Sequence, residues 1–141
     1  VSHSLIDFRA GMRLPAAFTA TGKSFLSHMS DFEVKRLYAD GLPEPRTPNS
    51  VQSMDQLLDE LRQTRENQYS VDNQQVAEGM VCFGGPESRP AAGVHPSRAV
   101  SLLVDDVTDT DPERIIADIR RIASKLSTRM GADLEDTMSA A

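Results

Sequence analysis

A few side chains in this sequence could do chemistry, and the first is its single cysteine, Cys82. A catalytic thiol needs a nearby histidine or helix start to lower its pKa. The three histidines are His3, His28 and His95, and none has a spacing that favours a catalytic pair with Cys82. One cysteine and three scattered histidines are also a poor ligand set for structural zinc. The residues favour an unreactive Cys82, with a thiol enzyme as the alternative.

Two other patterns suggest anion or metal chemistry and fail on spacing. The triplet Gly22-Lys23-Ser24 is not a phosphate-binding loop, because that loop needs a glycine five residues before Gly22 and position 17 is alanine. An acidic cluster follows later in the chain: Asp105, Asp106, Asp109 and Asp111. It lacks the glycine and distal glutamate of a calcium loop, and Asp111 is explained as a helix cap. We therefore expect no metal and no cofactor.

Thr21 and Gly22 stand at the start of a predicted helix, where they could hold an anion. The first N–H groups of a helix lack internal partners and carry the positive end of its dipole, so a carboxylate there is stabilised by about 1 kcal/mol or more. Ala20 and Gly22 are small enough to let a ligand reach the backbone. The alternative is that Thr19 or Thr21 simply caps the helix. The residues alone leave both interpretations open.

A second candidate group lies on the predicted central strands. Asp72 could accept a hydrogen bond from a ligand, or it could be an ordinary turn-forming aspartate. Met80 and Cys82 alternate along one strand, so they should point to the same face. They could be plain core residues, since methionine and free cysteine pack as apolar groups. The two interpretations are compatible, because a buried pocket has core-like walls.

Composition and charge limit the class of protein. The chain has 141 residues, which fits one domain, and a net charge of −6, which makes direct duplex DNA binding by this chain unfavourable. A single cysteine fits a reducing compartment. The sequence shows neither a membrane-length apolar run nor the profile of a signal peptide. We expect a cytoplasmic protein. Because the chain starts at Val1, within what looks like a strand, we also expect it to be part of something longer.

The first half is predicted to be mostly helical. A strand over 5–14, interrupted at Gly11, precedes a helix with an apolar face of Phe25, Leu26 and Met29. Ser30 and Glu33 have capping-box spacing and begin a second helix that stops at Gly41. A proline-rich loop over 42–50 follows. Ser53 and Gln56 repeat the capping-box spacing before a third helix, whose apolar residues are Met54, Leu57, Leu58 and Leu61.

The second half is predicted to supply the sheet and one long helix. Strands are expected over 69–72, 79–84 and 99–104, with a loop over 86–96. Asp111 caps a helix with Pro112 at its first position and Gly131 at its end. Its buried stripe is Ile115, Ile116, Ile119, Ile122, Ala123, Leu126 and Met130. This order predicts an α+β domain with a mostly antiparallel sheet, flanked by helices and closed by the long C-terminal helix.

Two stretches resemble a known family. Gly11-Met12-Arg13-Leu14-Pro15, followed by residues 19–26, looks like the Gly-x-Arg-apolar-Pro and Gly-Lys-Ala-x-Leu run of IclR-type bacterial transcription regulators. Residues 69–73, followed by 78–82, are similar to that family's Gly-Tyr-x-x-Asp-x-Glu and Gly-x-x-Cys run. Residues 57–66 look like its connecting helix. Their order and spacing together are specific, so the chain is identified as an IclR-type C-terminal domain.

The resemblance implies a GAF-like effector-binding domain over 1–141 that binds a small carboxylate or aromatic metabolite and forms dimers or tetramers. It implies no enzymatic activity, no cofactor and no membrane partner. DNA would be bound through a winged helix-turn-helix domain, which we expect to precede this chain. The positions that match the family's pocket are Leu14, Ala20, Thr21, Gly22, Asp72, Met80, Cys82 and Ser101.

The sequence departs from the family pattern in four places. Ala17 stands where the family has histidine, a proline-containing loop over 87–97 replaces the usual hairpin, and Leu103 replaces the second serine of Ser-x-Ser. The family's opening helix and two strands are not found before Val1, so a sheet edge is expected to favour self-association. The lost hydroxyl at Leu103 favours aromatic or branched acids over glyoxylate. A pure oligomerisation module without a ligand stays an alternative.

Overall fold

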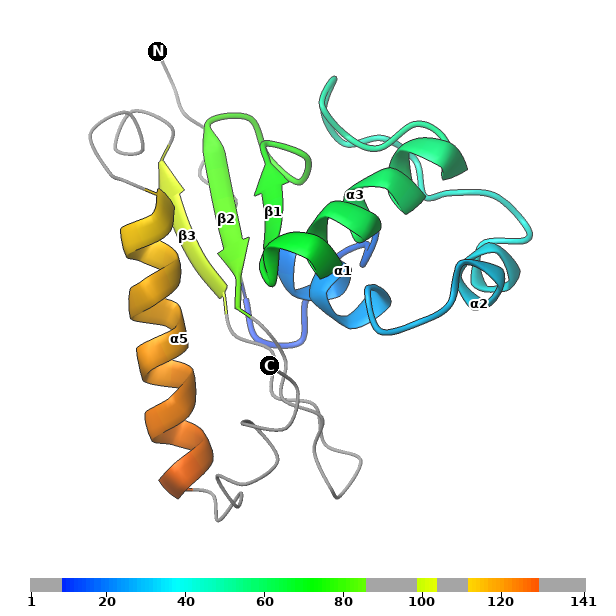
Figure 1. Ribbon diagram of the computed structural model, residues 1–141. Coiled ribbons are helices and arrows are strands. Elements are labelled where there is room, and N and C mark those ends of the chain that lie inside the picture. Colours follow the sequence, from blue (N-terminus) through cyan, green and yellow to red (C-terminus); the bar gives the residue numbers. More distant parts are fainter. Residues whose placement is uncertain (1–8, 86–98, 104–111, 130–141) are drawn as a thin grey trace.

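The computed structural model describes residues 9–85, 99–103 and 112–129, and it confirms the α+β architecture. Four helices are described in these ranges: α1 (Ala20–Leu26), α2 (Asp31–Leu37), α3 (Met54–Asn67) and α5 (Pro112–Arg129). The strands are β1 (Ser70–Asn73), β2 (Met80–Gly84) and β3 (Ala99–Leu103). They form an antiparallel sheet in the order β1-β2-β3, with α5 along one side and α1, α2 and α3 toward the other (Figure 1).

Local signals placed the helix starts well. Thr19 caps α1, Ser30 and Glu33 form the predicted capping box of α2, and the Ser53 side chain caps α3 by accepting from the Gln56 N–H. The Gln56 side chain does not complete a capping box with Ser53. Its Oε1 accepts from the N–H of Gln52 instead. α2 ends at Leu37, with Gly41 (φ 110°) in the turn that follows, and α5 begins at Pro112 as predicted.

The strand predicted over 5–14 is wrong where the structure describes it. Residues 9–14 form no strand, because the Met12 N–H donates to the Arg9 carbonyl at 3.0 Å and Gly11 takes a φ of 86°. This is a tight turn, and Gly11 is part of it rather than an interruption in a strand. Residues 5–8, 86–97, 104–111 and Gly131, on which further predictions fall, lie outside the described residues.

Two apolar clusters hold the domain together. The first joins α1, α2 and α3 around Ala17, Phe18, Leu26, Val34, Val51, Leu57, Leu61 and Val76. The second joins the sheet to α5 through Val81, Phe83 and Ile115. Together with Ile116, Ile115 confirms the start of the stripe predicted for the last helix. The side chains of its later members lie outside the described set.

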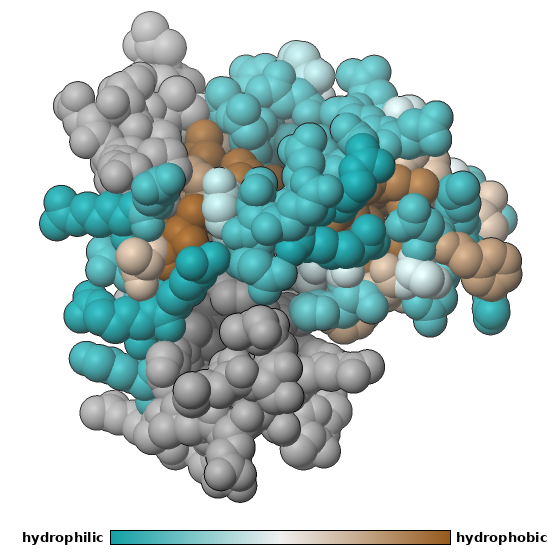
Figure 2. All heavy atoms as spheres, in the orientation of Figure 1, coloured by the Kyte–Doolittle hydropathy of each residue, from teal (hydrophilic) through white to brown (hydrophobic). Residues whose placement is uncertain are grey.

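The predicted apolar face of α1 is partly wrong. Leu26 is buried, but Phe25 is 43% exposed. The buried residues of α1 are Ala20, Lys23, Ser24 and Leu26, and Phe25 lies on its more exposed side. Figure 2 shows a mostly hydrophilic face with recessed apolar residues, and more apolar surface toward the α2 end, where Phe32 is 71% exposed.

Candidate functional site

Three predicted site residues form one row across the sheet. The antiparallel register pairs Asp72 of β1 with Cys82 of β2, and Cys82 with Ser101 of β3. The Cys82 Sγ lies 3.1 Å from the Ser101 Oγ, so both side chains project from the same face. Met80 lies two residues along β2, opposite Leu103, and is half-buried. The sheet thus brings together four of the eight predicted residues.

The adjacent row, Ser70 and Gly84, is where α1 packs on this face. The Ser70 Oγ donates to the Ala20 carbonyl at 2.6 Å and lies 2.7 Å from the Ser24 Oγ. A Cβ on Gly84 would lie 2.3 Å from the Ser70 Oγ, so glycine is needed for the helix to come this close. The predicted residue Ala20 is therefore one row from Asp72 and Cys82, buried and bonded through its carbonyl.

The start of α1 confirms the capping interpretation. The Thr19 Oγ1 accepts from the Gly22 N–H at 3.0 Å, so this donor already has a partner. A Cβ on Gly22 would lie 2.3 Å from the Ala16 carbonyl oxygen, so the small residue serves close packing of the chain. Thr21 is half-buried. The remaining predicted residue, Leu14, is also half-buried and packs against the α1–α3 cluster.

Asp72 is a buried carboxyl whose pKa is raised. It is 2% exposed, and burial is the main cause of the raised pKa. The Gln75 N–H, which donates to the Asp72 Oδ1 at 2.7 Å, and the charge of Lys23 act in the opposite direction. A carboxyl in this setting holds a proton more readily than an exposed one, so it can donate to a ligand oxygen as well as accept.

Cys82 lies in surroundings that oppose thiol chemistry. Burial raises the pKa of its thiol, and the nearby Asp72 raises it further, while the Ser101 hydrogen bond lowers it. A raised pKa reduces the thiolate fraction at neutral pH, and the thiolate is the nucleophile. His28, the histidine within the described residues, is exposed and is not a hydrogen-bond partner of Cys82 there. The raised pKa of the thiol therefore favours a packing role for Cys82 over a catalytic one.

A buried ion pair next to the row was missed by sequence reasoning. Lys23 is 1% exposed; its Nζ pairs with Glu60 at 2.5 Å and donates to the Val71 carbonyl at 2.9 Å. The Gln75 Nε2 donates to both Glu60 carboxylate oxygens, at 3.1 and 3.2 Å. The available signals were a lysine between buried positions of α1 and a glutamate beside Leu61 on α3. Both residues are usually exposed, so only the fold reveals the pair.

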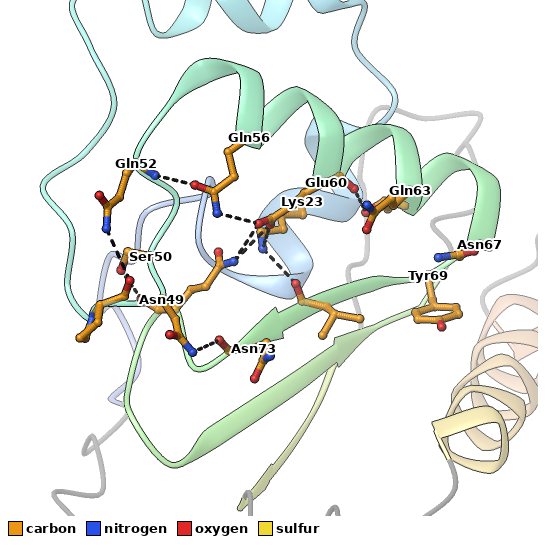
Figure 3. A pocket seen from close by; sticks show the side chains of 14 residues that line it. Lys23, Asn49, Ser50, Gln52, Gln56, Glu60, Gln63, Asn67, Tyr69 and Asn73 are labelled. Atoms are coloured by element: carbon orange, nitrogen blue, oxygen red, sulfur yellow. Dashed lines mark hydrogen bonds and ion pairs between the residues drawn. The ribbon is translucent and has the colours of Figure 1, made fainter.

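A polar groove of about 690 Å³ lies between α3 and β1 (Figure 3). Its lining residues are Lys23, Pro48, Asn49, Ser50, Gln52, Gln56, Glu60, Gln63, Thr64, Asn67, Tyr69, Val71, Asn73 and Gln75. None of the eight predicted site residues is among them. Within the described residues there is no group of three or more His, Cys, Asp or Glu suited to a metal ion. No helix in those ranges has the length and apolar character needed to cross a bilayer.

Comparison with known proteins agrees with the fold. The family model described as bacterial transcriptional regulator IclR C-terminal matches residues 2–128. The chain therefore belongs to the IclR-type family of bacterial transcription regulators and corresponds to the C-terminal domain of its members. It is 27% identical over 123 residues to the HTH-type transcriptional regulator XynR of Escherichia coli, a match that covers 87% of this chain and 49% of that protein. The chain spans about half the length of such curated relatives.

Solved structures give the same result. The repressor BlcR of Agobacterium tumefaciens superimposes with a TM-score of 0.80 and 38% identity, covering 90% of this chain and 51% of that one. A double mutant of the inducer-binding domain of the transcription factor PobR from Acinetobacter, solved with 3-hydroxybenzoic acid, gives a TM-score of 0.68 at 20% identity, over 86% and 73% of the two chains. These likenesses confirm the GAF-like α+β fold of IclR-type C-terminal domains.

Proposed function

We propose that this domain senses a small carboxylate or aromatic metabolite and thereby modulates DNA binding by a separate N-terminal domain. The observation that carries the proposal is the row of Asp72, Cys82 and Ser101, which places a carboxyl, a thiol and a hydroxyl side by side on one sheet face. A few convergent polar groups against an apolar wall are typical of small-molecule sites. Because its relatives are transcription regulators, we place this activity in the cytoplasm.

Each residue of the proposed site has a definite role. Asp72 and Ser101 contact polar groups of the ligand, while Leu14, Met80 and Cys82 contact its apolar body. The positions Ala20, Thr21 and Gly22 border the site at the start of α1. Because the pKa of Asp72 is raised, this carboxyl takes up a proton more readily than an exposed aspartate, and in its protonated form it donates to a ligand carboxylate instead of repelling it.

The PobR domain supports the ligand class, since a protein of this fold has been solved with an aromatic acid. The lack of a hydroxyl at Leu103 favours the same class. The effector acts as a switch if it binds two conformations of the regulator unequally. A domain that assembles without binding any ligand is the alternative, and its signature is the absence of any stabilisation by metabolic acids.

The test compares 3-hydroxybenzoate, isovalerate and glyoxylate in thermal unfolding. A ligand at 100 times its Kd adds about 2.7 kcal/mol to the free energy of unfolding, which is seen as a raised Tm. We expect the first two acids to exceed glyoxylate. Ser101→Ala and Cys82→Trp should reduce the shift, whereas Ala99→Ser, an exposed change on the same strand, should not. Equal shifts in all variants would place the ligand elsewhere.

We also propose that the domain forms a homodimer or homotetramer. The exposed apolar side chains of α2 support a contact surface there, since Phe32 is 71% and Leu37 is 57% exposed. Sedimentation at micromolar concentration should show a dimer or larger species, and Phe32→Ser should shift it toward monomer. A monomer in the unsubstituted chain contradicts this part of the proposal without affecting ligand binding.

A further inference from the structure

Carboxamide side chains gather along the groove between α3 and β1. The chain has three asparagines and six glutamines. All three asparagines and four of the glutamines line this one groove: Asn49, Asn67, Asn73, Gln52, Gln56, Gln63 and Gln75 (Figure 3). The two that do not are Gln68 and Gln74. A surface that collects most of the chain's carboxamides has a defined hydrogen-bonding character.

Helix α3 presents these groups as a regular stripe. Gln56, Glu60, Gln63 and Asn67 follow one another at helical spacing and line the groove. Leu57 and Leu61 lie on the buried side of the same helix, in the α1–α3 cluster. The helix therefore has an apolar side for folding and a carboxamide side facing β1, an edge strand of the described sheet.

Counted over the described residues that line it, the groove carries no net charge, although the chain carries −6. Its charged lining residues are Lys23 and Glu60, and these two form an ion pair with each other at 2.5 Å. An anionic or cationic ligand would have to break this pair to gain a charged partner. Neutral ligands meet no such cost.

The backbone carbonyls of β1 in the groove are already bonded to side chains. Val71 accepts from the Lys23 Nζ at 2.9 Å, and Asn73 accepts from the Asn49 Nδ2 at 3.3 Å. An added peptide strand would need such carbonyls for main-chain hydrogen bonds. This favours a compact ligand bound by side chains over an extended peptide.

One buried acceptor of a residue that lines the groove has no hydrogen-bond partner in the described part of the chain. The Gln75 side chain is held by its Nε2 bonds to Glu60, while its Oε1 is buried and has no hydrogen-bond partner within the described residues. Gln75 is 6% exposed. A buried acceptor without a hydrogen bond is unfavourable, so a donor that enters the groove and reaches it would be stabilising.

We propose that this groove binds a neutral polyhydroxyl compound, a sugar or polyol. A hydroxyl both donates and accepts, and so does a carboxamide, whereas carboxylates and ammonium groups do only one. Tyr69 adds an aromatic ring at one end, suited to the apolar face of a sugar ring. The volume of about 690 Å³ lies within the range of small-molecule sites. The site is separate from the Asp72 row and does not depend on the function proposed above.

The experiment is a nitrogen–proton NMR titration of the 141-residue chain with maltose, xylose and sorbitol, and with gluconate as the charged comparison. Side-chain NH₂ groups of Asn and Gln give their own signals. We expect a neutral probe to move those of Gln63, Asn67 and Asn73, to leave that of Gln68 in place, and to bind more tightly than gluconate. No movement with any neutral probe at high millimolar concentration overturns the proposal.

Two variants and one matched control test the residues. Gln63→Ala and Asn67→Ala replace exposed residues of α3 with a good helix former, so folding should persist. Each should weaken binding about tenfold, as expected for one or two lost hydrogen bonds. Glu66→Ala, exposed on the same helix and outside the groove lining, should leave binding unchanged.

Two outcomes separate this site from others. If a neutral probe moves the backbone signals of Cys82 and Ser101 instead, it binds the sheet face, and the groove proposal is wrong while the effector proposal stands. If dilution without any sugar moves the same carboxamide signals, the groove is a contact between copies of the chain, which also overturns the proposal.

Discussion

The sheet-face row and the carboxamide groove share strand β1 but are assembled in different ways. The row takes one residue from each of three strands, so its geometry is set by the register of the sheet. Most of the groove comes from residues 48–75, a continuous stretch, so its geometry is set by one helix and its neighbouring loop and strand. Sites of the first kind depend on long-range pairing, and sites of the second kind on local helical spacing.

Lys23 lines the groove and its charge acts on Asp72 of the row, and its loss should have the largest effect. Lys23→Met removes the charged partner of Glu60, which keeps its hydrogen bonds from Gln75, and the side-chain donor of the Val71 carbonyl. We therefore expect the free energy of unfolding to fall by about 3 kcal/mol. Urea unfolding measures this as a lower midpoint. The control is Arg62→Met, which breaks an exposed pair with Asp59 and should cost under about 1 kcal/mol. Equal losses would mean that the buried pair contributes no more than a surface one.

Gly84→Ala should affect the row without directly altering the groove. The new Cβ would lie 2.3 Å from the Ser70 Oγ and 3.0 Å from the Ala20 carbonyl, so α1 must shift or strain. We expect a loss of about 2 kcal/mol in the free energy of unfolding. Signals of Cys82 and Ser101 should move in NMR spectra, while the Gln63 side-chain signal stays. Movement of both sets would show that the two sites are not independent.

Asp72→Asn should change how stability depends on pH. Because the pKa of Asp72 is raised in the folded state above its ordinary 3.8, the folded protein binds the proton more tightly than the unfolded chain. The stabilisation from this protonation is complete below 3.8 and is lost as pH rises through the folded pKa. Asparagine does not titrate. The stability of the unsubstituted protein, measured relative to Asp72→Asn, should therefore decline as pH rises from 3.8, and a constant difference would contradict the raised pKa.

Gln63→Ala should have the smallest effect on folding. Gln63 is exposed on α3, so the free energy of unfolding should change by less than about 0.5 kcal/mol. Thermal unfolding without added ligand measures this. A large loss would mean that the carboxamide stripe stabilises the fold, which would weaken its interpretation as a binding surface.

Sequence reasoning succeeded where the determinants are local. Caps at Thr19, Ser30 and Ser53 could be predicted because a hydroxyl side chain that accepts from the N–H three residues later favours the start of a helix. The pairing of Met80 and Cys82 on one face followed from the two-residue period of a strand. The family resemblance predicts that Ser101 and Cys82 belong to one pocket. The two segments alone do not determine the register that pairs these residues across the strands.

The failures have a common physical origin. The apolar pattern predicts Phe25 on the buried side of α1, but the contacts of Ala20 and Ser24 with Ser70 of the sheet decide which side is covered. Gly22 was interpreted as room for a ligand, yet the preceding turn packs against it. The burial of Lys23 depends on Glu60, 37 positions away in the chain. In each case the burial or packing of the residue is decided by a residue distant in sequence or by the path of the backbone.

The short connection between β1 and β2 limits how this domain can diverge among relatives. Side chains alternate between faces every residue, so losing one residue from 74–79 would turn β2 over relative to β1. Val81 and Phe83 would then take the place of Cys82, and the contact with α5 would be lost at the same time. Substitutions at Asp72, Cys82 or Ser101 carry no such penalty. Asp72, Cys82 and Ser101 can therefore be substituted without changing the strand register, whereas the length of this connection is fixed by both faces at once.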